Sequence, residues 1–329
     1  MDKKDVLIPG GGGAAGTGAI KSLRLVKHRG KIISTDSNAL SAGLYLADRG
    51  YKVPPATSGL FVEAALDIIK KERLDVVLPT SGFDIIPYSK HKTVFEQEGV
   101  TVAMSDYEVI DTCLDKKRFY GRLKGRFDLP FTATHKSESV MYPCIVKPVF
   151  GKGSKDVFFC GNESDLDEKM KVHQNMLIQE YLPGREFTID VLSDLDKRAI
   201  VAVPRERIEV KAGISFKGKI VLDTGIQNEC VEVAEYLGIR GPSCMQMKCD
   251  CNGVPKIVEV NPRMGGGTIM ATYAGINFPD LVLKLANDEQ FQVPDIKDIT
   301  MLRFYEEVIL DACGAVISDE STRFWRTPG

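Results

Sequence analysis

Short apolar runs alternate with amphipathic segments along the first hundred residues. Buried strands are predicted at DVLIPG, KIISTD, DVVLPT and VTVAM, because each is a brief run of mainly apolar residues. Between these strands, residues 16–29, 59–72 and 84–98 place apolar side chains at helical spacing. This alternation is typical of an α/β fold in which helices cover both faces of a parallel sheet.

The pattern changes near residue 105. Two short helices are predicted, over 105–113 with Ser105 as the N-cap and over 114–124. Strands are predicted in PCIVKPVFGKGSKDVFFC and NMLIQEYLPGREFTIDVL, on either side of a helix near 163–173. From 197 to 260 strands dominate, broken by one helix near 226–237. The chain therefore divides into an alternating α/β part and a later part built from hairpins with longer loops.

The composition is that of an ordinary globular chain. The 329 residues, 43% hydrophobic and 27% charged, suffice for about two or three domains. A net charge of −2 gives no reason to expect nucleic acid or an anionic membrane as a partner. No apolar run reaches the ~18 residues of a membrane span, and no signal-peptide pattern is visible. Eight dispersed cysteines favour reduced thiols and hence a cytoplasmic protein.

The segment CMQMKCDCNGVPKIVEVNPR carries a strong hairpin signal. Asn252-Gly253 stands between two apolar-alternating runs and predicts a two-residue turn. In that register Gln246 lies opposite Glu259, and Asn261 shares the face of Glu259 because residues two apart do so. The resulting carboxylate and amides are oxygen ligands suited to Mg²⁺. A solvated polar face of the hairpin is the alternative.

Two further segments place polar groups beside breaks in the chain. Lys147 leads into the loop GKGS at 151–154, whose glycine N–H groups and lysine charge suit phosphate oxygens. A plain surface turn would have the same composition. In LIQEYLPGREF a strand breaks at PG and resumes at Glu186, which leaves backbone groups that an adenine edge could satisfy.

The stretch IPGGGGAAGTG has the spacing of a dinucleotide-binding turn. Gly11, Gly13 and Gly16 match G-x-G-x-x-G, and Asp36 lies twenty residues after Gly16. Gly13 and Gly16 are expected to need a positive φ or a close backbone approach. An NAD(P)-dependent oxidoreductase is therefore a candidate, although this function leaves Lys147, Glu259 and Asn261 unexplained.

Taken in order with Lys116 in LDKKRF, these motifs resemble the ATP-grasp superfamily. The segment VEVNPRMGGGTIMATYAGINFPDLVLKLA is similar to the metal-and-triphosphate segment of carbamoyl-phosphate synthetase large subunits and related stand-alone ligases. Gln246 fits that branch, whereas many other ATP-grasp enzymes have Asp there. The resemblance implies three parts: a Rossmann-like pre-ATP-grasp domain over 1–104, an ATP-grasp N-terminal lobe over 105–182, and a C-terminal lobe with the metal site over 183–329.

The resemblance also implies roles for individual residues. The nucleotide would be held by Lys116, Lys147, Gly151, Gly153, Ser154, Gln179, Glu180, Tyr181, Leu182 and Glu186. Mg²⁺, with Mn²⁺ able to substitute, would be held by Gln246, Glu259 and Asn261. Catalysis would fall to Arg263, Arg205 and Arg207, unless the last two form structural salt bridges. The substrate would border Gly13, Ser81 and Asp84, although a helix start explains Ser81 and Asp84 equally well.

The implied activity is ATP-dependent ligation. A carboxylate, expected to belong to an amino acid, becomes an acyl phosphate and is attacked by an amine, with release of ADP and phosphate. None of the four histidines lies in the motifs, and phosphoryl transfer of this kind needs no protein nucleophile. The expected partners are small molecules, and a homodimer is the common assembly of soluble proteins. An ATP-binding module without catalysis is a further alternative.

Overall fold

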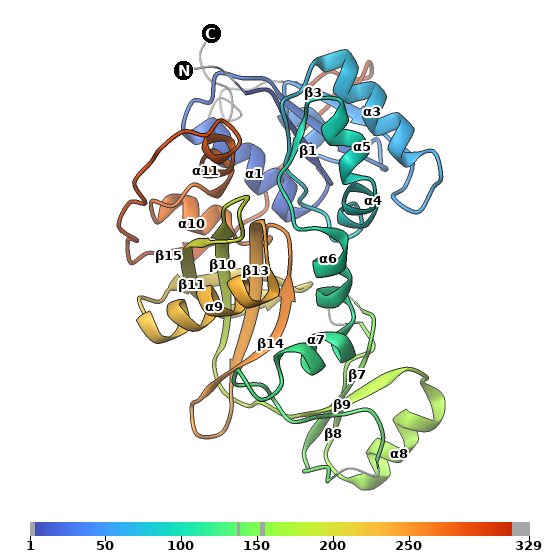
Figure 1. Ribbon diagram of the computed structural model, residues 1–329. Coiled ribbons are helices and arrows are strands. Elements are labelled where there is room, and N and C mark those ends of the chain that lie inside the picture. Colours follow the sequence, from blue (N-terminus) through green and yellow to red (C-terminus); the bar gives the residue numbers. More distant parts are fainter. Residues whose placement is uncertain (1–3, 137–138, 152–154, 318–329) are drawn as a thin grey trace.

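The fold is described from a computed structural model over residues 4–136, 139–151 and 155–317 (Figure 1). Its three sheets follow one another along the chain. In Figure 1 the N-terminal sheet lies at the top, a six-stranded sheet lies below it, and a four-stranded sheet with one helix lies at the bottom. None of the helices within the described ranges is long and apolar enough to cross a membrane.

The N-terminal sheet is parallel and has the strand order β3-β2-β1-β4-β5. Its strands are β1 (Val6–Pro9), β2 (Ile32–Asp36), β3 (Arg49–Lys52), β4 (Val76–Val77) and β5 (Thr101–Val102). Its helices are α1 (Ala14–Leu25), α2 (Gly43–Leu46), α3 (Phe61–Glu72), α4 (Ile85–Lys90) and α5 (Lys92–Gln97). The predicted α/β sheet is confirmed, and the mostly exposed edge strand β3 is an addition.

Two predicted helices differ in extent. The helix predicted over 84–98 is two helices, because the backbone at His91 (φ −111°, ψ 21°) leaves the helical region. The helix predicted over 16–29 is α1, which ends at Leu25. Lys27 takes a left-handed conformation (φ 52°), and its N–H closes onto the carbonyl of Arg24. A left-handed residue just after the last turn is a common helix stop.

Two helices connect the N-terminal sheet to the rest of the molecule: α6 (Tyr107–Leu114) and α7 (Lys116–Leu123). Ser105 is not the N-cap of α6, so that prediction is wrong. Its buried hydroxyl accepts a hydrogen bond from the backbone N–H of Arg240 at 3.0 Å, and Asp106 takes the cap position. Asp115 caps α7 and thereby fixes Lys116 at the first helical position.

The four-stranded sheet is antiparallel, with the order β6-β9-β7-β8. It comprises β6 (Thr132–Ala133), β7 (Cys144–Pro148), β8 (Phe158–Cys160) and β9 (Met176–Glu180), with α8 (Glu163–Val172) packed beside it (Figure 1). Asn162 caps α8. Lys147 is on β7 and Gln179 on β9, two strands that pair directly.

The six-stranded sheet is antiparallel, with the order β14-β13-β10-β11-β12-β15. Its strands are β10 (Glu186–Ser193), β11 (Ala199–Lys211), β12 (Ile214–Ile220), β13 (Gly241–Cys249), β14 (Pro255–Asn261) and β15 (Thr300–Leu302). Helix α9 (Thr224–Leu237) covers one face, and α10 (Ile269–Tyr273) and α11 (Phe278–Leu285) follow β14.

The N-terminal sheet and the six-stranded sheet share one apolar core. A single cluster contains Ala19 and Leu23 of α1 together with Val203 of β11 and Phe278 of α11. Polar contacts reinforce this junction: the Asn277 amide donates to the carbonyl of Ser22 at 2.7 Å. The two parts are therefore packed as one unit on this side.

Candidate nucleotide and metal site

A cavity of about 410 Å³ lies between the four-stranded sheet and the β13–β14 hairpin. Its volume falls in the range of roughly 300–1,000 Å³ that is usual for small-molecule sites. Of the predicted site residues, the lining contains Lys116, Lys147, Gly151, Gln179, Glu180, Tyr181, Leu182, Glu186, Arg207, Gln246, Glu259, Asn261 and Arg263. Gly153 and Ser154 lie outside the described residues.

The β13–β14 hairpin places Gln246 directly opposite Glu259, as predicted. The predicted two-residue turn is wrong, however. The loop has five residues, 250–254, and the Asp250 carboxylate closes it by accepting from the N–H groups of Asn252 and Val254. A bulge at Val258 absorbs the resulting one-residue offset. The predicted pairing holds because these two departures from a regular hairpin cancel.

Glu259, Asn261 and Arg263 form one connected group. The Asn261 amide donates to Glu259 Oε1 at 2.8 Å, and Arg263 Nη2 lies 3.4 Å from Asn261 Oδ1. Arg263 is held in turn by the carbonyl of Met264 at 2.7 Å. Within the described ranges no three His, Cys, Asp or Glu side chains cluster as a metal cage. A cation here would need further oxygen ligands, as Mg²⁺ takes from phosphates and water.

Lys147 lines the cavity and is buried, with 6% of its surface exposed. Its Nζ lies 3.3 Å from the hydroxyl of Tyr120 and above the ring of that tyrosine. Burial lowers the pKa of Lys147 to about 7, opposed by the charge of Glu259 and assisted by that of Lys116. Lys116 is 9% exposed and donates to the carbonyl of Gly151 at 3.2 Å. Two amines thus converge where an anion would bind.

The break between β9 and β10 carries two ion pairs. Glu180 binds Lys256 through both carboxylate oxygens, at 2.7 and 2.9 Å, and accepts from the N–H of Phe131. Glu186 pairs with Arg207, whose Nη2 donates to the carbonyl of Gly213 at 2.8 Å. Both predicted nucleotide-binding acids are therefore engaged with cations of the protein.

Comparisons with known proteins bear on the identity of this arrangement. A family described as the PylC-like N-terminal domain matches residues 13–103, and one described as ATP-grasp in the biosynthetic pathway with Ter operon matches residues 172–307. The chain contains an ATP-grasp domain that follows a PylC-like N-terminal domain. The superfamily that the motifs resemble is thereby confirmed.

The chain is homologous to carbamoyl phosphate synthase large chains. It is 27% identical over 315 residues to the one of Methanobrevibacter smithii, which covers 83% of this chain and 29% of the relative. The arginine-specific large chain of Bacillus subtilis is 24% identical over 253 residues, which cover 70% of this chain and 24% of the relative. The chain thus spans less than a third of the length of these curated relatives.

Solved structures share the fold at lower identity. N5-carboxyaminoimidazole synthetase from Staphylococcus aureus, complexed with ADP, has a TM-score of 0.70, 18% identity and coverage of 94% of this chain and 84% of its own. The L-amino acid ligase from Bacillus licheniformis has a TM-score of 0.66 and 16% identity, covering 87% and 75%. The predicted fold class, a Rossmann-like part followed by an ATP-grasp part, is confirmed by these neighbours.

Arg205 lies outside the cavity lining of this ATP-grasp fold. It is 3% exposed, its Nε lies 2.8 Å from Asp190 Oδ2, and its Nη1 lies 3.1 Å from the hydroxyl of Ser215. Thr268 donates to the other oxygen of Asp190 at 2.7 Å. A Cβ at Gly267 would lie 2.4 Å from Arg205 Nη1. These contacts favour the structural salt bridge of the two roles considered for Arg205.

The N-terminal glycine turn is closed by the protein itself. Asp36 Oδ2 accepts from the N–H of Gly12 at 2.7 Å, so the acid expected at a dinucleotide ribose instead holds the turn. Gly16 is required for close packing, since a Cβ there would lie 2.5 Å from the carbonyl oxygen of Gly10. Gly13 is extended (φ −86°) without a close contact, so the expectation for that residue is wrong. The positive φ belongs to Gly10 (74°).

The remaining predicted substrate residues lie beside this turn. A Cβ at Gly10 would touch Ser81, whose hydroxyl accepts from the N–H of Phe83 at 3.2 Å. Asp84 is at the N-cap position of α4. Gly13, Ser81 and Asp84 are absent from the lining of the 410 Å³ cavity. Their role toward a substrate stays a prediction.

Tyr120 and Lys256 hold site residues in place and are absent from the predicted set. Tyr120 holds Lys147 and donates to the carbonyl of Val258 at the bulge. A signal for it exists, because Tyr120 lies four residues after Lys116 on one face of α7. Lys256 contacts Glu180 from 76 residues away, and no local pattern in the sequence predicts that pairing.

Proposed function

We propose that this protein is an ATP-dependent ligase that converts a carboxylate into an acyl phosphate and joins it to an amine, releasing ADP and phosphate. The observation that carries the proposal is the convergence of two buried lysines and the Glu259–Asn261–Arg263 group on one cavity. This charge pattern suits a triphosphate with its cation. Homology to carbamoyl phosphate synthase large chains supports the same class of chemistry.

The donor groups fit ATP and Mg²⁺. The lowered pKa of Lys147 reflects a buried amine whose described hydrogen-bond partner is a neutral hydroxyl, so a phosphate would add a directly bound opposite charge. Gln246, Glu259 and Asn261 offer oxygen atoms but only one carboxylate. Mg²⁺, or Mn²⁺ in its place, would therefore be shared with phosphate oxygens.

Catalysis in such a site is mainly positioning and neutralisation of charge. A carboxylate is a poor electrophile because its oxygen leaves badly, and phosphorylation turns that oxygen into a good leaving group. Bound Mg²⁺ supplies positive charge to the phosphate oxygens. Lys116 and Lys147 would hold the α- and β-phosphates, and Arg263 would stabilise the charge on the transferred phosphoryl group. Tyr120 keeps Lys147 in position.

The base and ribose would lie at the break between β9 and β10. Residues Tyr181 and Leu182 line the cavity and offer backbone N–H and C=O groups for an adenine edge. Glu180 and Glu186 already bind Lys256 and Arg207. A ribose hydroxyl would share the Glu186 carboxylate with Arg207 rather than take it over.

Amino acids are the proposed substrates. One structural neighbour is an L-amino acid ligase, and this supports an amino-acid carboxylate and an amino-acid amine for this chain. The decisive experiment is ADP release screened over pairs of amino acids, with the products identified by mass spectrometry. We expect a condensed product formed in equal amount to ADP, and its loss in Lys147→Ala.

A thermal-shift assay separates this function from a dinucleotide-dependent one. ATP with Mg²⁺ should raise the melting temperature, and NAD or NADP should not, because only a ligand that binds the native state stabilises it. Stabilisation by NAD(P) without a response to ATP would contradict the proposal.

A further inference from the structure

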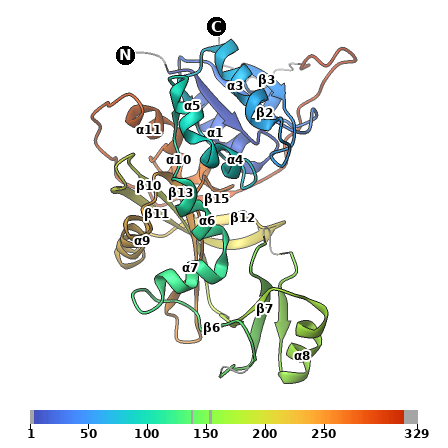
Figure 2. The same ribbon diagram turned by 45° about the vertical axis from the view of Figure 1, so that its right-hand side comes forward.

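A second cavity, of about 1,130 Å³, lies between α1 and the β12–β15 edge of the six-stranded sheet. Its walls come from α1, α2, α10, the β11–β12 hairpin and residues 301–308. In Figure 2 the chain after β15 runs from the six-stranded sheet toward the N-terminal sheet. Of the residues assigned to the nucleotide and metal, none that the structure describes lines this cavity, whose volume exceeds that of the first one.

Arg303 differs from the other cations that line this cavity. It is half-buried, and its Nη2 donates to the carbonyl of Gly266 at 2.7 Å. Burial, with the nearby charge of Arg205, lowers the pKa of Arg303. Among the described lining residues, the three other cations each face an acid: Lys21 faces Glu306, Arg24 faces Asp48, and Lys211 faces Glu209. No carboxylate of the described residues lies within ion-pair distance of Arg303.

The rest of the lining is rich in aromatic and aliphatic side chains. Phe304 and Tyr305 are 76% and 79% exposed, and Tyr273 is 55% exposed. The rings of Phe216 and Tyr305 lie 6.0 Å apart. Exposed aromatic side chains gathered around a recess mark a binding surface rather than a folded core. The recess therefore suits a ligand with a large apolar body.

The two cavities adjoin each other. Ala212, in the β11–β12 turn, lines both. Gly266, whose carbonyl holds Arg303, is three residues after Arg263, which lines the first cavity. An anion bound at Arg303 would therefore lie at the side of the second cavity that faces the candidate nucleotide site.

We propose that the second cavity binds the carboxylate substrate, an organic acid with a bulky, largely apolar body whose carboxylate pairs with Arg303. The half-buried guanidinium lacks a described acid, and a carboxylate would supply a bidentate partner. The volume of the cavity suits a molecule larger than a small amino acid. This inference rests on the proposed function, because it names the class of acid that the ligase would activate.

The test uses the full-length protein without nucleotide. The probes are N-acetyl-phenylalanine and indole-3-acetate, each compared with its neutral primary amide, and binding is measured by calorimetry and by saturation-transfer NMR. Arg303→Met keeps the aliphatic stem and removes the charge. Lys217→Met is the matched control: Lys217 lies on β12 opposite Leu302, is half-exposed and is outside the cavity lining.

We expect the acids to bind at least tenfold more tightly than their amides. Arg303→Met should weaken acid binding at least tenfold, and Lys217→Met should change it less than twofold. Equal binding of acid and amide, or equal effects of the two variants, would overturn the inference. If Arg303→Met fails to fold, Phe304→Ala carries the test, because this exposed ring should be needed for binding, and unchanged affinity would also overturn it.

Failure of this inference and failure of the proposed function give different results. Stabilisation by ADP with Mg²⁺, together with no binding of any acid, would overturn the second-cavity site and leave the ligase proposal intact. Arg303-dependent acid binding without any response to nucleotide would overturn the ligase proposal and leave the acid site of the second cavity intact.

Discussion

Lys147 shows how burial sets the chemistry of a single side chain. The amine has a neutral hydroxyl as its described hydrogen-bond partner, and its pKa falls to about 7 because burial disfavours the charged form. A phosphate placed beside it would favour the charged form again. Nucleotide binding should therefore be coupled to protonation of this one group.

At pH 8 we expect binding of ATP with Mg²⁺ to take up as much as about one proton, because a largely neutral Lys147 becomes charged beside phosphate. Calorimetry in buffers of different ionisation enthalpy measures this uptake. Lys147→Met should lose the uptake and bind more weakly, whereas Lys116→Met should weaken binding and retain the uptake. Equal proton uptake in wild type and Lys147→Met would contradict the role of Lys147.

Glu259 is the only carboxylate in the proposed metal set. Glu259→Gln keeps the shape and the hydrogen bond with Asn261 but removes the negative charge. Turnover should fall by about 10²–10³-fold or more, the usual cost of losing a key electrostatic group. The assay is ADP release, with circular dichroism to confirm folding. Glu209→Gln, at a partly exposed acid paired with Lys217, is the control, and unchanged turnover in Glu259→Gln would refute the metal assignment.

The residues found from sequence and those missed differ in one physical respect. Lys147 and Glu259 stand in local contexts that carry their own signal: a strand before a glycine loop, and a hairpin face. Lys256 and Arg303 act through groups brought near by tertiary folding, Glu180 in one case and Gly266 in the other. Local pattern contains no information about such contacts, so they could not be predicted.

Among the structural elements, the β13–β14 hairpin shows both the strength and the limit of prediction from pattern. Alternation of apolar residues predicted the pairing of Gln246 with Glu259, which one buried face enforces. The predicted two-residue turn at Asn252-Gly253 does not form, because Asp250 closes a longer loop. The bulge that restores the register is at Val258, where the Tyr120 hydroxyl docks, and that contact comes from another part of the chain.

The loop after β14 depends on the buried pair of Arg205 and Asp190. Removing one partner leaves an uncompensated buried charge, which costs about 3–5 kcal/mol. Asp190→Asn should therefore lower the free energy of unfolding by about that amount, as measured by urea denaturation. Lys284→Gln, which breaks a more exposed i,i+4 pair with Asp280, should cost less than about 1 kcal/mol. Similar losses of unfolding free energy in both variants would show that the Arg205–Asp190 pair does not stabilise the loop after β14.

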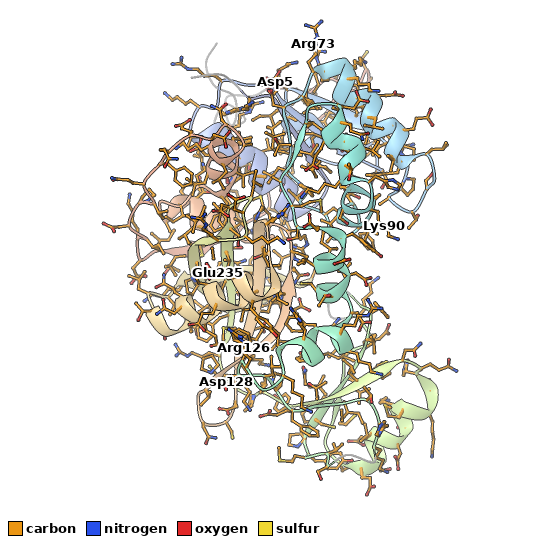
Figure 3. All side chains as sticks on the ribbon, in the orientation of Figure 1. Asp5, Arg73, Lys90, Arg126, Asp128 and Glu235 are labelled. Carbon is orange, nitrogen blue, oxygen red and sulfur yellow. The ribbon has the colours of Figure 1, made fainter. Side chains whose placement is uncertain are left out.

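Helix α9 carries a partly buried acid, Glu229. Burial first, and the charge of Asp128 second, raise the pKa of Glu229 to about 7. Figure 3 labels Asp128, on the segment after α7, and Glu235, further along α9. A raised pKa in the folded state means that the native protein binds the proton more tightly than the unfolded chain. The contribution of Glu229 to stability therefore falls as the pH rises from about 4.5 to about 7.

Glu229→Gln should remove that pH dependence. The variant should match wild type near pH 4.5 and be more stable than wild type at pH 8, where wild type must ionise this partly buried acid. Urea denaturation at the two pH values measures the difference. Glu235→Gln, at an exposed acid further along the same helix, is the control. A variant that is less stable than wild type at pH 8 would contradict the assignment.

At the scale of the whole molecule, the sequence predicted the kinds of layers but not how they join. The N-terminal parallel sheet and the strand-rich remainder follow from periodicity. Strand β3 was missed because it is a polar edge strand without alternation, and β15 was missed because its three residues are too few to show a pattern. The contact of α1 with α10 and α11 buries apolar side chains. The sequence shows that these side chains are apolar, but it does not show which helices they pack against.

The shared core predicts that the N-terminal sheet and the six-stranded sheet unfold together. Asn277 joins them, because its amide donates to the Ser22 carbonyl and its oxygen caps α11 through the N–H of Asp280. Asn277→Asp keeps the capping oxygen, removes the donor to Ser22 and buries a charge, so it should cost about 1–3 kcal/mol. Because the core is continuous, hydrogen exchange in α1 and in β10 should accelerate to the same extent, whereas the exposed control Gln290→Ala should change neither. Faster exchange in α1 with β10 unchanged would show instead that the N-terminal sheet opens independently, and that substrates could enter the second cavity by its separation from the six-stranded sheet.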